Sequence, residues 1–232
     1  MDTQELIELI QRALPPEILN KSGTIVYSSV SSICKGDLYI MGLNPGGASG
    51  PQIIQTLENL QEKHLNSYED DERWGRYEQG QHPLQKNYRS LKTYLNDDKE
   101  IFSTNLIFTR SRDATKANYP EAAKDCWPVH EILIDIIDPK CLIVFGNGPI
   151  SPYSFIRDHL PSTITLDIAP PKKAGHKNWV VRSSEAYIKG KKRLVIGVPH
   201  LSLYRITNRN NSNNDCFEII NWIKEKIDTF EN

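Results

Sequence analysis

The sequence predicts an α/β protein of three layers, in which helices cover both faces of a central, mainly parallel four-stranded sheet. The first observation is a set of four short, largely apolar runs, as expected of buried parallel strands: residues 38–43, 101–108, 141–145 and 194–198. The second is that segments with helical spacing of apolar residues separate these runs. The third is that the runs lead into polar, glycine- or proline-containing loops.

Helices are expected around and between the strands. Apolar spacing predicts a helix over residues 3–13, and two prolines at 15 and 16 end it. Further helices are predicted over residues 51–65, 83–95, 120–137, 151–160 and 215–230. We expect residues 66–82 to form a loop and residues 161–192 to be irregular or antiparallel, with candidate strands at 179–181 and 186–188. Because no linker divides the chain, residues 1–232 are expected to form one domain.

Charge is unevenly distributed along the 232 residues. The net charge is −1, yet residues 170–209 hold ten Lys and Arg residues and a single acid, Glu185. A basic segment on an acidic body is either a solvated loop or a surface that binds a polyanion such as DNA.

The composition also bears on location and cofactors. No apolar run is long enough to span a membrane, and the first residues carry acids without a basic region, so we expect a cytoplasmic protein that does not bind membranes. The four cysteines are scattered without a CxxC pair, which argues against a metal or iron–sulfur site. We expect no metal, no organic cofactor and a monomer.

Polar residues follow the predicted strands. Asn44 lies in a glycine-rich loop, Gly42-Leu-Asn-Pro-Gly-Gly47, which matches neither nucleotide-binding glycine motif. Asn105 lies within a predicted buried strand, and Asn147 and His200 follow the third and fourth strands. The carboxyl ends of parallel strands share one edge, where open α/β sheets bind ligands. We therefore expect these four residues to converge around a pocket.

Three of these motifs resemble those of the uracil-DNA glycosylase superfamily. Residues 42–46 look like the Gly-x-Asn-Pro-Gly form of its mismatch-specific and single-strand-selective branches. Residues 198–205 look like its His-Pro-Ser-Pro loop, with Leu201 and Leu203 in place of both prolines, and residues 104–106 are similar to the strand that carries a pyrimidine-reading Asn. The resemblance extends from about residue 37 to the C-terminus, and it implies a uracil-DNA glycosylase-like fold.

The resemblance implies a monofunctional DNA glycosylase that flips a nucleotide, hydrolyses its N-glycosidic bond and leaves an abasic site. Asn44 would orient the attacking water, and His200 would donate a hydrogen bond to the departing base. Asn105 would read the base, within a binding surface that also includes Gly42, Leu43, Pro45, Gly46 and Gly47. Tyr204 would fill the gap in the duplex. The other residues expected to contact DNA are Ser202, Leu203, Arg205, Arg209, Lys172 and Lys173.

Departures from the family pattern suggest the substrate. Glycines follow Pro45 where the founding branch has an aromatic wall beside C5 of the pyrimidine, and Leu57 stands where a related branch has a stacking aromatic. Tyr68, Trp74 and Tyr77 are alternatives for stacking. An open C5 side favours a bulky base such as glucosylated hydroxymethylcytosine in phage DNA, which would place the protein in antiviral defence, whereas uracil would place it in DNA repair. A non-catalytic reader of modified bases and a hydrolase of nucleosides or nucleotides are the alternatives.

Overall fold

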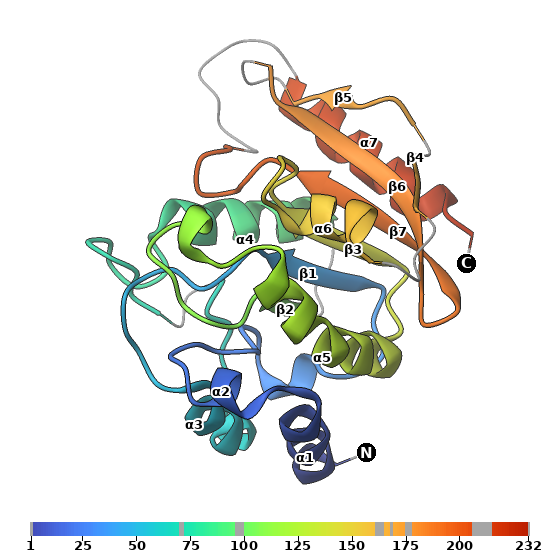
Figure 1. Ribbon diagram of the computed structural model, residues 1–232. Helices are drawn as coiled ribbons and strands as arrows, with labels where there is room; N and C mark the ends of the chain where they lie inside the picture. The colour runs from blue at the N-terminus through green and yellow to red at the C-terminus, as the bar shows by residue number, and fades with distance from the viewer. Residues whose placement is uncertain are drawn as a thin grey trace.

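The computed structural model (Figure 1) describes residues 2–69, 72–95, 100–160, 165–167, 169–174, 178–205 and 215–231. A mixed sheet lies at its centre. Six strands follow one another in the order β2-β1-β3-β7-β6-β4, and a seventh, β5, pairs with β6. The strands are β1 (Leu38–Gly42), β2 (Phe102–Asn105), β3 (Cys141–Phe145), β4 (Thr165–Asp167), β5 (Lys172–Lys173), β6 (Val180–Ile188) and β7 (Lys191–Val198).

The four predicted strands form the parallel part of this sheet. β1 is parallel to β2 and to β3, and β3 is parallel to β7. The prediction of only four strands is wrong, because β6 pairs antiparallel with β7 and extends the sheet to β4 and β5. The β6–β7 connection is the two-residue turn Lys189-Gly190, in which both residues have positive φ. Such turns match the twist of a hairpin, and the two candidate strands at 179–181 and 186–188 are in fact one.

Helices occupy most of the predicted positions. The α-helices are α1 (Thr3–Ala13), α2 (Pro16–Leu19), α3 (Ile53–Glu58), α4 (Pro83–Leu95), α5 (Glu121–Ile137), α6 (Pro152–Asp158) and α7 (Asp215–Thr229). Three short 3-10 turns are η1 (Val30–Ser32), η2 (Leu60–Glu62) and η3 (Ala114–Lys116). The helix predicted over residues 51–65 is shorter, because Asn59 caps α3 and the chain continues as η2.

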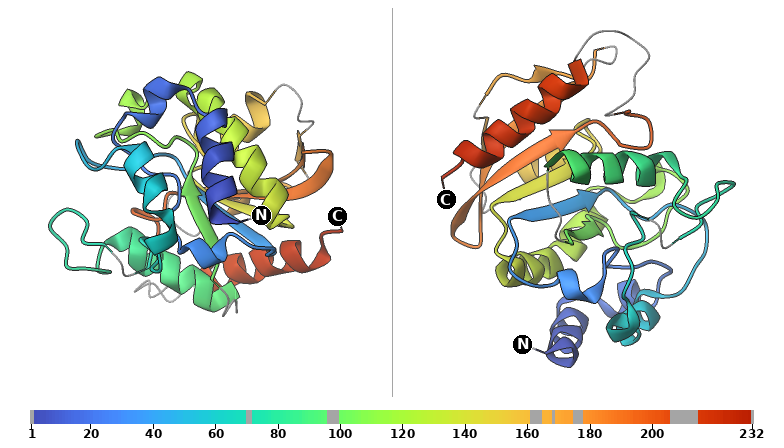
Figure 2. Two further views of the ribbon diagram at one scale, coloured as in Figure 1. Left: turned by 90° about the horizontal axis from the view of Figure 1, so that it is seen from below. Right: turned by 180° about the vertical axis from the view of Figure 1, so that it is seen from behind.

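Alternate residues of each strand face opposite sides of the sheet, and both sides are covered. Tyr39 and Met41 belong to the apolar cluster that includes residues of α1, α3, α5 and α6. Leu38 and Ile40 belong to a second cluster with residues of α4 and α7. Figure 2 shows α4 and α7 on one face and α1 and α5 on the other. This arrangement is compatible with three layers. Among the described residues, no helix is long and apolar enough to cross a membrane.

Candidate active site

The carboxyl ends of the four parallel strands form one edge of the sheet, and the predicted site residues lie at this edge. Asn105 is the last residue of β2, while Asn44 and His200 each stand two residues beyond the end of a strand, β1 and β7. β1 lies between β2 and β3, and β3 pairs in turn with β7. The fold therefore brings three distant parts of the sequence to the edge where such sheets bind ligands.

The polar residue after β3 has a structural role. Asn147 also lies at this edge, but its Nδ2 donates hydrogen bonds to the carbonyl oxygens of Val180 at 2.6 Å and Gly197 at 2.9 Å. Because those two residues belong to β6 and β7, Asn147 ties the end of β3 to the antiparallel pair.

Asn44 is held through its amide nitrogen. Nδ2 donates to the carbonyl oxygen of Pro45 and to Oγ of Ser111, each at 2.8 Å. A carbonyl oxygen can only accept, so the Pro45 contact identifies the nitrogen side of the amide. Ser111 gives its own proton to the Asp113 carbonyl and therefore accepts from Asn44. Oδ1 is left as an acceptor that has no partner among the residues the structure describes.

Asn105 and Tyr68 meet beside Gly42. The Tyr68 hydroxyl lies 2.9 Å from Asn105 Oδ1 and 3.1 Å from the Thr104 carbonyl oxygen. A Cβ atom at position 42 would lie 2.8 Å from this hydroxyl and closer still to Asn105 Oδ1, so glycine is required there. Asn105 is only 4% exposed, and a buried amide is costly unless it is paired. Tyr68 supplies that partner and covers much of the predicted base reader.

An aromatic cluster surrounds this contact. The rings of Tyr27 and Tyr68 are stacked with centroids 4.7 Å apart, and the Trp74 ring packs edge-on against both. Of the three aromatics considered for stacking, Tyr68 and Trp74 lie in this cluster, whereas Tyr77 packs against His82 at 5.1 Å. Burial raises the pKa values of Tyr27 and Tyr68, so both hydroxyls keep their protons near neutral pH.

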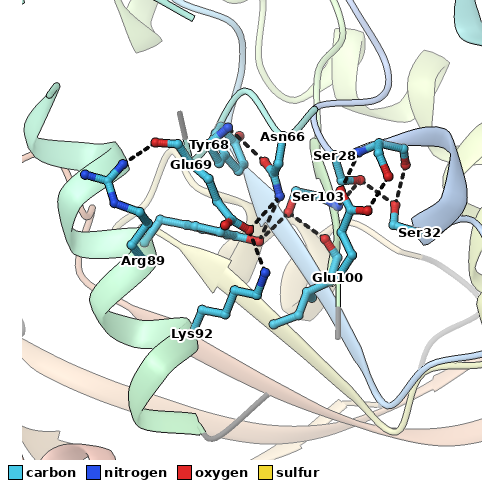
Figure 3. Close-up of polar contacts among 12 residues, drawn as sticks. Ser28, Ser32, Asn66, Tyr68, Glu69, Arg89, Lys92, Glu100 and Ser103 are labelled. Atoms are coloured by element: carbon cyan, nitrogen blue, oxygen red, sulfur yellow. Dashed lines mark hydrogen bonds and ion pairs between the residues drawn. The ribbon is translucent and has the colours of Figure 1, made fainter. Parts of the chain in front are cut away.

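A network of buried polar contacts fixes the loop that carries Tyr68 (Figure 3). The Tyr68 N–H donates to Asn66 Oδ1 at 2.9 Å, and Asn66 Nδ2 reaches the Tyr88 hydroxyl at 3.4 Å. Tyr88 of α4 in turn bonds to Ser103 of β2 at 2.9 Å. The same loop is joined to α4 by the Lys92–Glu69 ion pair at 2.8 Å. Two secondary-structure elements therefore position Tyr68 against Asn105.

His200 is oriented by its own loop. Nδ1 lies 3.2 Å from the Ser202 backbone nitrogen and 2.7 Å from Ser202 Oγ. Because the backbone N–H can only donate, Nδ1 must accept, which places the proton of the neutral ring on Nε2. Burial lowers the pKa of His200, and nearby His82 lowers it further. The ring is therefore neutral near pH 7, and Nε2–H has no partner among the described residues.

The loop after His200 corrects one prediction. Tyr204, expected to enter the duplex, is 1% exposed, and its hydroxyl donates to the Ala174 carbonyl at 3.1 Å. The wedge assignment of Tyr204 is therefore wrong. Its neighbour Leu203 is 70% exposed, whereas Leu201 is fully buried. Arg205 is exposed.

The basic residues between positions 170 and 209 do not form one surface. Lys191 and Arg193 lie near the start of β7, at the opposite end of that strand from His200. Both reach Asp138, at 2.8 Å and 2.6 Å, and Arg193 is buried. Arg193 therefore has a structural role, because a buried guanidinium needs such a partner.

Two other basic residues of this segment lie near the loop that follows His200. Lys172 and Lys173 form β5, and the next residue, Ala174, accepts the hydrogen bond from Tyr204. Lys173 is exposed, whereas Lys172 is only partly exposed and its Nζ lies 3.8 Å from Glu218 of α7. Their contact with DNA stays a prediction. The predicted DNA contact Arg209 lies outside the described residues.

Three residues near the site were missed in the sequence. Tyr27 precedes β1, outside the region of the family resemblance. Arg110 and Ser111 belong to the polar loop after β2, and both hold the loop of Asn44, since Arg110 Nη1 donates to the Gly46 carbonyl at 2.8 Å. The short apolar run of residues 25–27 and the polarity of the 109–118 loop are the only signals that could have found them.

In the part of the chain that the structure describes, no group of three or more His, Cys, Asp or Glu side chains could hold a metal ion. A scan of the sequence against family models and a search of curated proteins found no match. The geometry of the site and the motifs themselves are therefore the basis for assigning a function.

Proposed function

We propose that this protein is a monofunctional DNA glycosylase that removes a flipped, C5-modified pyrimidine and leaves an abasic site. The observation that carries the proposal is the placement of Asn44, Asn105 and His200 at one edge of the sheet. The atoms presented there, an amide oxygen and an imidazole N–H, are those that glycosidic hydrolysis requires. Membership of the uracil-DNA glycosylase superfamily and a cytoplasmic, monomeric state belong to the same proposal.

The reaction needs a positioned water and a stabilised leaving group. Asn44 cannot act as a general base, because an amide does not titrate, but its Oδ1 accepts a hydrogen bond from the water and directs the oxygen at the sugar carbon C1′. As the glycosidic bond breaks, its electron pair goes to the base, and positive charge builds on the sugar. The water then bonds to C1′ and loses a proton to solvent.

His200 acts on the departing base. Its neutral ring donates a hydrogen bond from Nε2–H to the base oxygen that gains charge. The donor is in place before the reaction because Ser202 fixes the opposite nitrogen. One such preorganised donor contributes about 2.7–4 kcal/mol to the transition state.

Contacts with DNA come from the surface around His200. We assign the wedge to Leu203, an exposed apolar side chain between Ser202 and Tyr204. Such a side chain fills the gap that the flipped nucleotide leaves in the duplex and so stabilises the flipped state. Arg205, Lys172 and Lys173 contact the phosphates, which position the duplex without reading its sequence. Ser202 acts instead on His200, to which both of its donors are bound.

The two glycines after Pro45 favour a substrate with a bulky group at C5. A Cβ atom at Gly46 would meet no atom within 4 Å, and the nearest atom to a Cβ at Gly47 would be Arg110 Nη1 at 4.0 Å. The two glycines therefore contribute no side chain where an aromatic wall would exclude C5 substituents. Glucosylated hydroxymethylcytosine of phage DNA fits this opening, and a role in antiviral defence follows; activity on uracil would indicate DNA repair.

The test is a panel of oligonucleotides scored for alkali-sensitive strand breaks. The panel contains uracil, a thymine mismatch, 5-hydroxymethylcytosine and its glucosylated form, each in single-stranded and duplex DNA. Cleavage must be lost in Asn44→Ala and His200→Ala and retained in His64→Ala, which removes an exposed histidine. Cleavage of uracil alone would refute the bulky-base assignment. Equal cleavage by all three variants would refute the site.

A second candidate is a module that binds modified bases without cutting them. The observation that favours it is the burial of Asn105 beneath Tyr68. The two candidates differ in one result: a reader binds the modified oligonucleotide but yields no breaks with any base. A hydrolase of free nucleosides would instead bind its substrate with little dependence on salt, whereas contacts to phosphates make binding strongly salt-dependent.

A further inference from the structure

A hollow in the surface lies beside the loop that carries Asn44. It has a volume of about 340 Å³, within the range of roughly 300–1,000 Å³ typical of small-molecule sites. Residues 24–26 form one wall, and α3 with η2 forms another. Pro51 and three charged residues, Lys63, Glu72 and Arg110, also line it.

Arg110 connects this pocket to the candidate active site. Its Nη1 donates to the Gly46 carbonyl at 2.8 Å, and the guanidinium lies against Gly50. Its Nε is buried and has no hydrogen-bond partner among the described residues, although an unpaired buried donor is costly. Arg110 therefore has one donor bound to the catalytic loop and another that remains to be satisfied.

Tyr27 provides a second link. Val26 lines the pocket, and the ring of Tyr27, the next residue, stacks on Tyr68, whose hydroxyl bonds to Asn105. Burial raises the pKa of Tyr27, while Arg110 and Glu72 act on the same hydroxyl in opposite directions. A chain of contacts through Tyr27 and Tyr68 thus leads from the wall of the pocket to the predicted base reader.

The chemistry of the walls selects the kind of ligand. Lys63 and Arg110 supply positive charge, and Glu62 and Glu72 supply negative charge, so the lining has no net charge. A phosphate or carboxylate needs an excess of positive charge, and this lining offers none. The lining instead combines uncharged hydrogen-bonding side chains with apolar ones. This combination suits a neutral ligand that is rich in hydroxyl groups. The polar members are Gln55, Thr56 and Asn59, and the apolar ones are Ile25, Leu57 and Leu60.

We infer that this pocket binds a neutral, hydroxyl-rich substituent, of the size of a hexose, attached to C5 of the flipped base. The inference rests on the proposed glycosylase function and adds the residues that recognise the substituent. The substituent passes over Gly46 and Gly47, where side chains are missing, and the guanidinium of Arg110, which lines the pocket, donates to one of its hydroxyl groups. Glu72 accepts from another.

The experiment fills the pocket while leaving the catalytic residues unchanged. Thr56→Trp places a large ring in the hollow, and Asn59→Trp does so from an exposed position. Glu58→Trp is the matched control, since Glu58 is exposed, belongs to the same helix and does not line the pocket. The probes are two oligonucleotides that differ only in carrying 5-hydroxymethylcytosine or its glucosylated form. Thermal melting checks that each variant folds.

We expect both filling variants to reduce single-turnover cleavage of the glucosylated oligonucleotide at least tenfold, with less than a twofold change on 5-hydroxymethylcytosine. The Glu58→Trp control should resemble the parent on both. If filling the pocket leaves cleavage of both oligonucleotides unchanged, or reduces both equally, the pocket assignment is overturned. The glycosylase function stands in either case.

Equilibrium binding separates the two proposals. If the parent cuts neither oligonucleotide but binds the glucosylated one at least tenfold more tightly, and filling the pocket removes this preference, the pocket assignment stands and catalysis is refuted. If the parent neither cuts nor prefers the glucosylated oligonucleotide, both proposals are overturned.

Discussion

Replacing His200 tests the most specific part of the mechanism. The imidazole forms its only described hydrogen bonds through Nδ1 to Ser202, so His200→Ala removes these bonds together with the Nε2–H donor. The backbone bonds from Leu203 and Tyr204 to the His200 carbonyl oxygen remain. Loss of one preorganised donor costs about 2.7–4 kcal/mol in the transition state, which is a reduction of roughly 10²–10³ in the rate constant. The strand Leu194–Val198 and the buried ring of Tyr204 still anchor the loop.

The assay is single-turnover cleavage of the best oligonucleotide from the base panel, followed between pH 5.5 and 8.5. Burial and His82 lower the pKa of His200, so the neutral donor persists below the usual histidine pKa of about 6.5. We expect a rate constant that is flat from pH 8.5 to below 6.5 and falls only where His200 takes up a proton, because a proton on Nδ1 displaces the Ser202 donors that orient the ring. Ser202→Ala weakens only the positioning of the ring and should cost less than about tenfold. A fivefold or smaller loss in His200→Ala, or a rate that increases as the pH falls below 7, would refute the reasoning.

Three further predictions concern the surroundings of the site. Leu203→Ala should leave the melting temperature unchanged, because the side chain is 70% exposed, and should slow cleavage in duplex DNA more than in single strands. Tyr68→Phe removes the donor to Asn105 and should lower the free energy of unfolding by about 1 kcal/mol while reducing discrimination between cytosine- and uracil-type bases in the panel. His130 is buried, and burial lowers its pKa from 6.5 to about 4, so the unfolded state binds a proton first as the pH falls. The free energy of unfolding should therefore decrease by about 3 kcal/mol between pH 6.5 and 4, and urea titrations of His130→Gln should lack this part of the decrease.

The parallel half of the sheet could be predicted because its strands are buried on both faces. Such strands carry apolar residues at nearly every position, as in Cys141–Phe145, and little else in a soluble protein has that pattern. β6 was harder to find because Arg182, Ser183 and Ser184 interrupt its apolar residues. Its identity is set by pairing with β7 across a tight turn, a tertiary effect that overrides local preference.

The same distinction applies to the site. Asn44, Asn105 and His200 could be placed together because topology alone determines where parallel strands end. The exposure of Leu203 and Tyr204 could not be predicted, because both are apolar neighbours in one loop. Tyr204 is buried in the second apolar cluster, and its hydroxyl donates to the carbonyl oxygen of Ala174, thirty residues away in the chain. Contacts of this kind depend on how a loop folds back, which neither spacing nor composition encodes.

The contacts of Asn44 explain why an amide, and not a carboxylate, suits this position. Nδ2 lies 2.8 Å from the Pro45 carbonyl oxygen, and a carboxylate would place two acceptors at that distance with no proton between them. The loop is therefore built around a group that donates on one side and accepts on the other. In the proposed reaction, an amide accepts from water but cannot remove its proton, so the bond to the base would break largely before the water attacks. A reaction of that kind depends on stabilising the leaving base, which places most of the catalytic effect on the His200 donor.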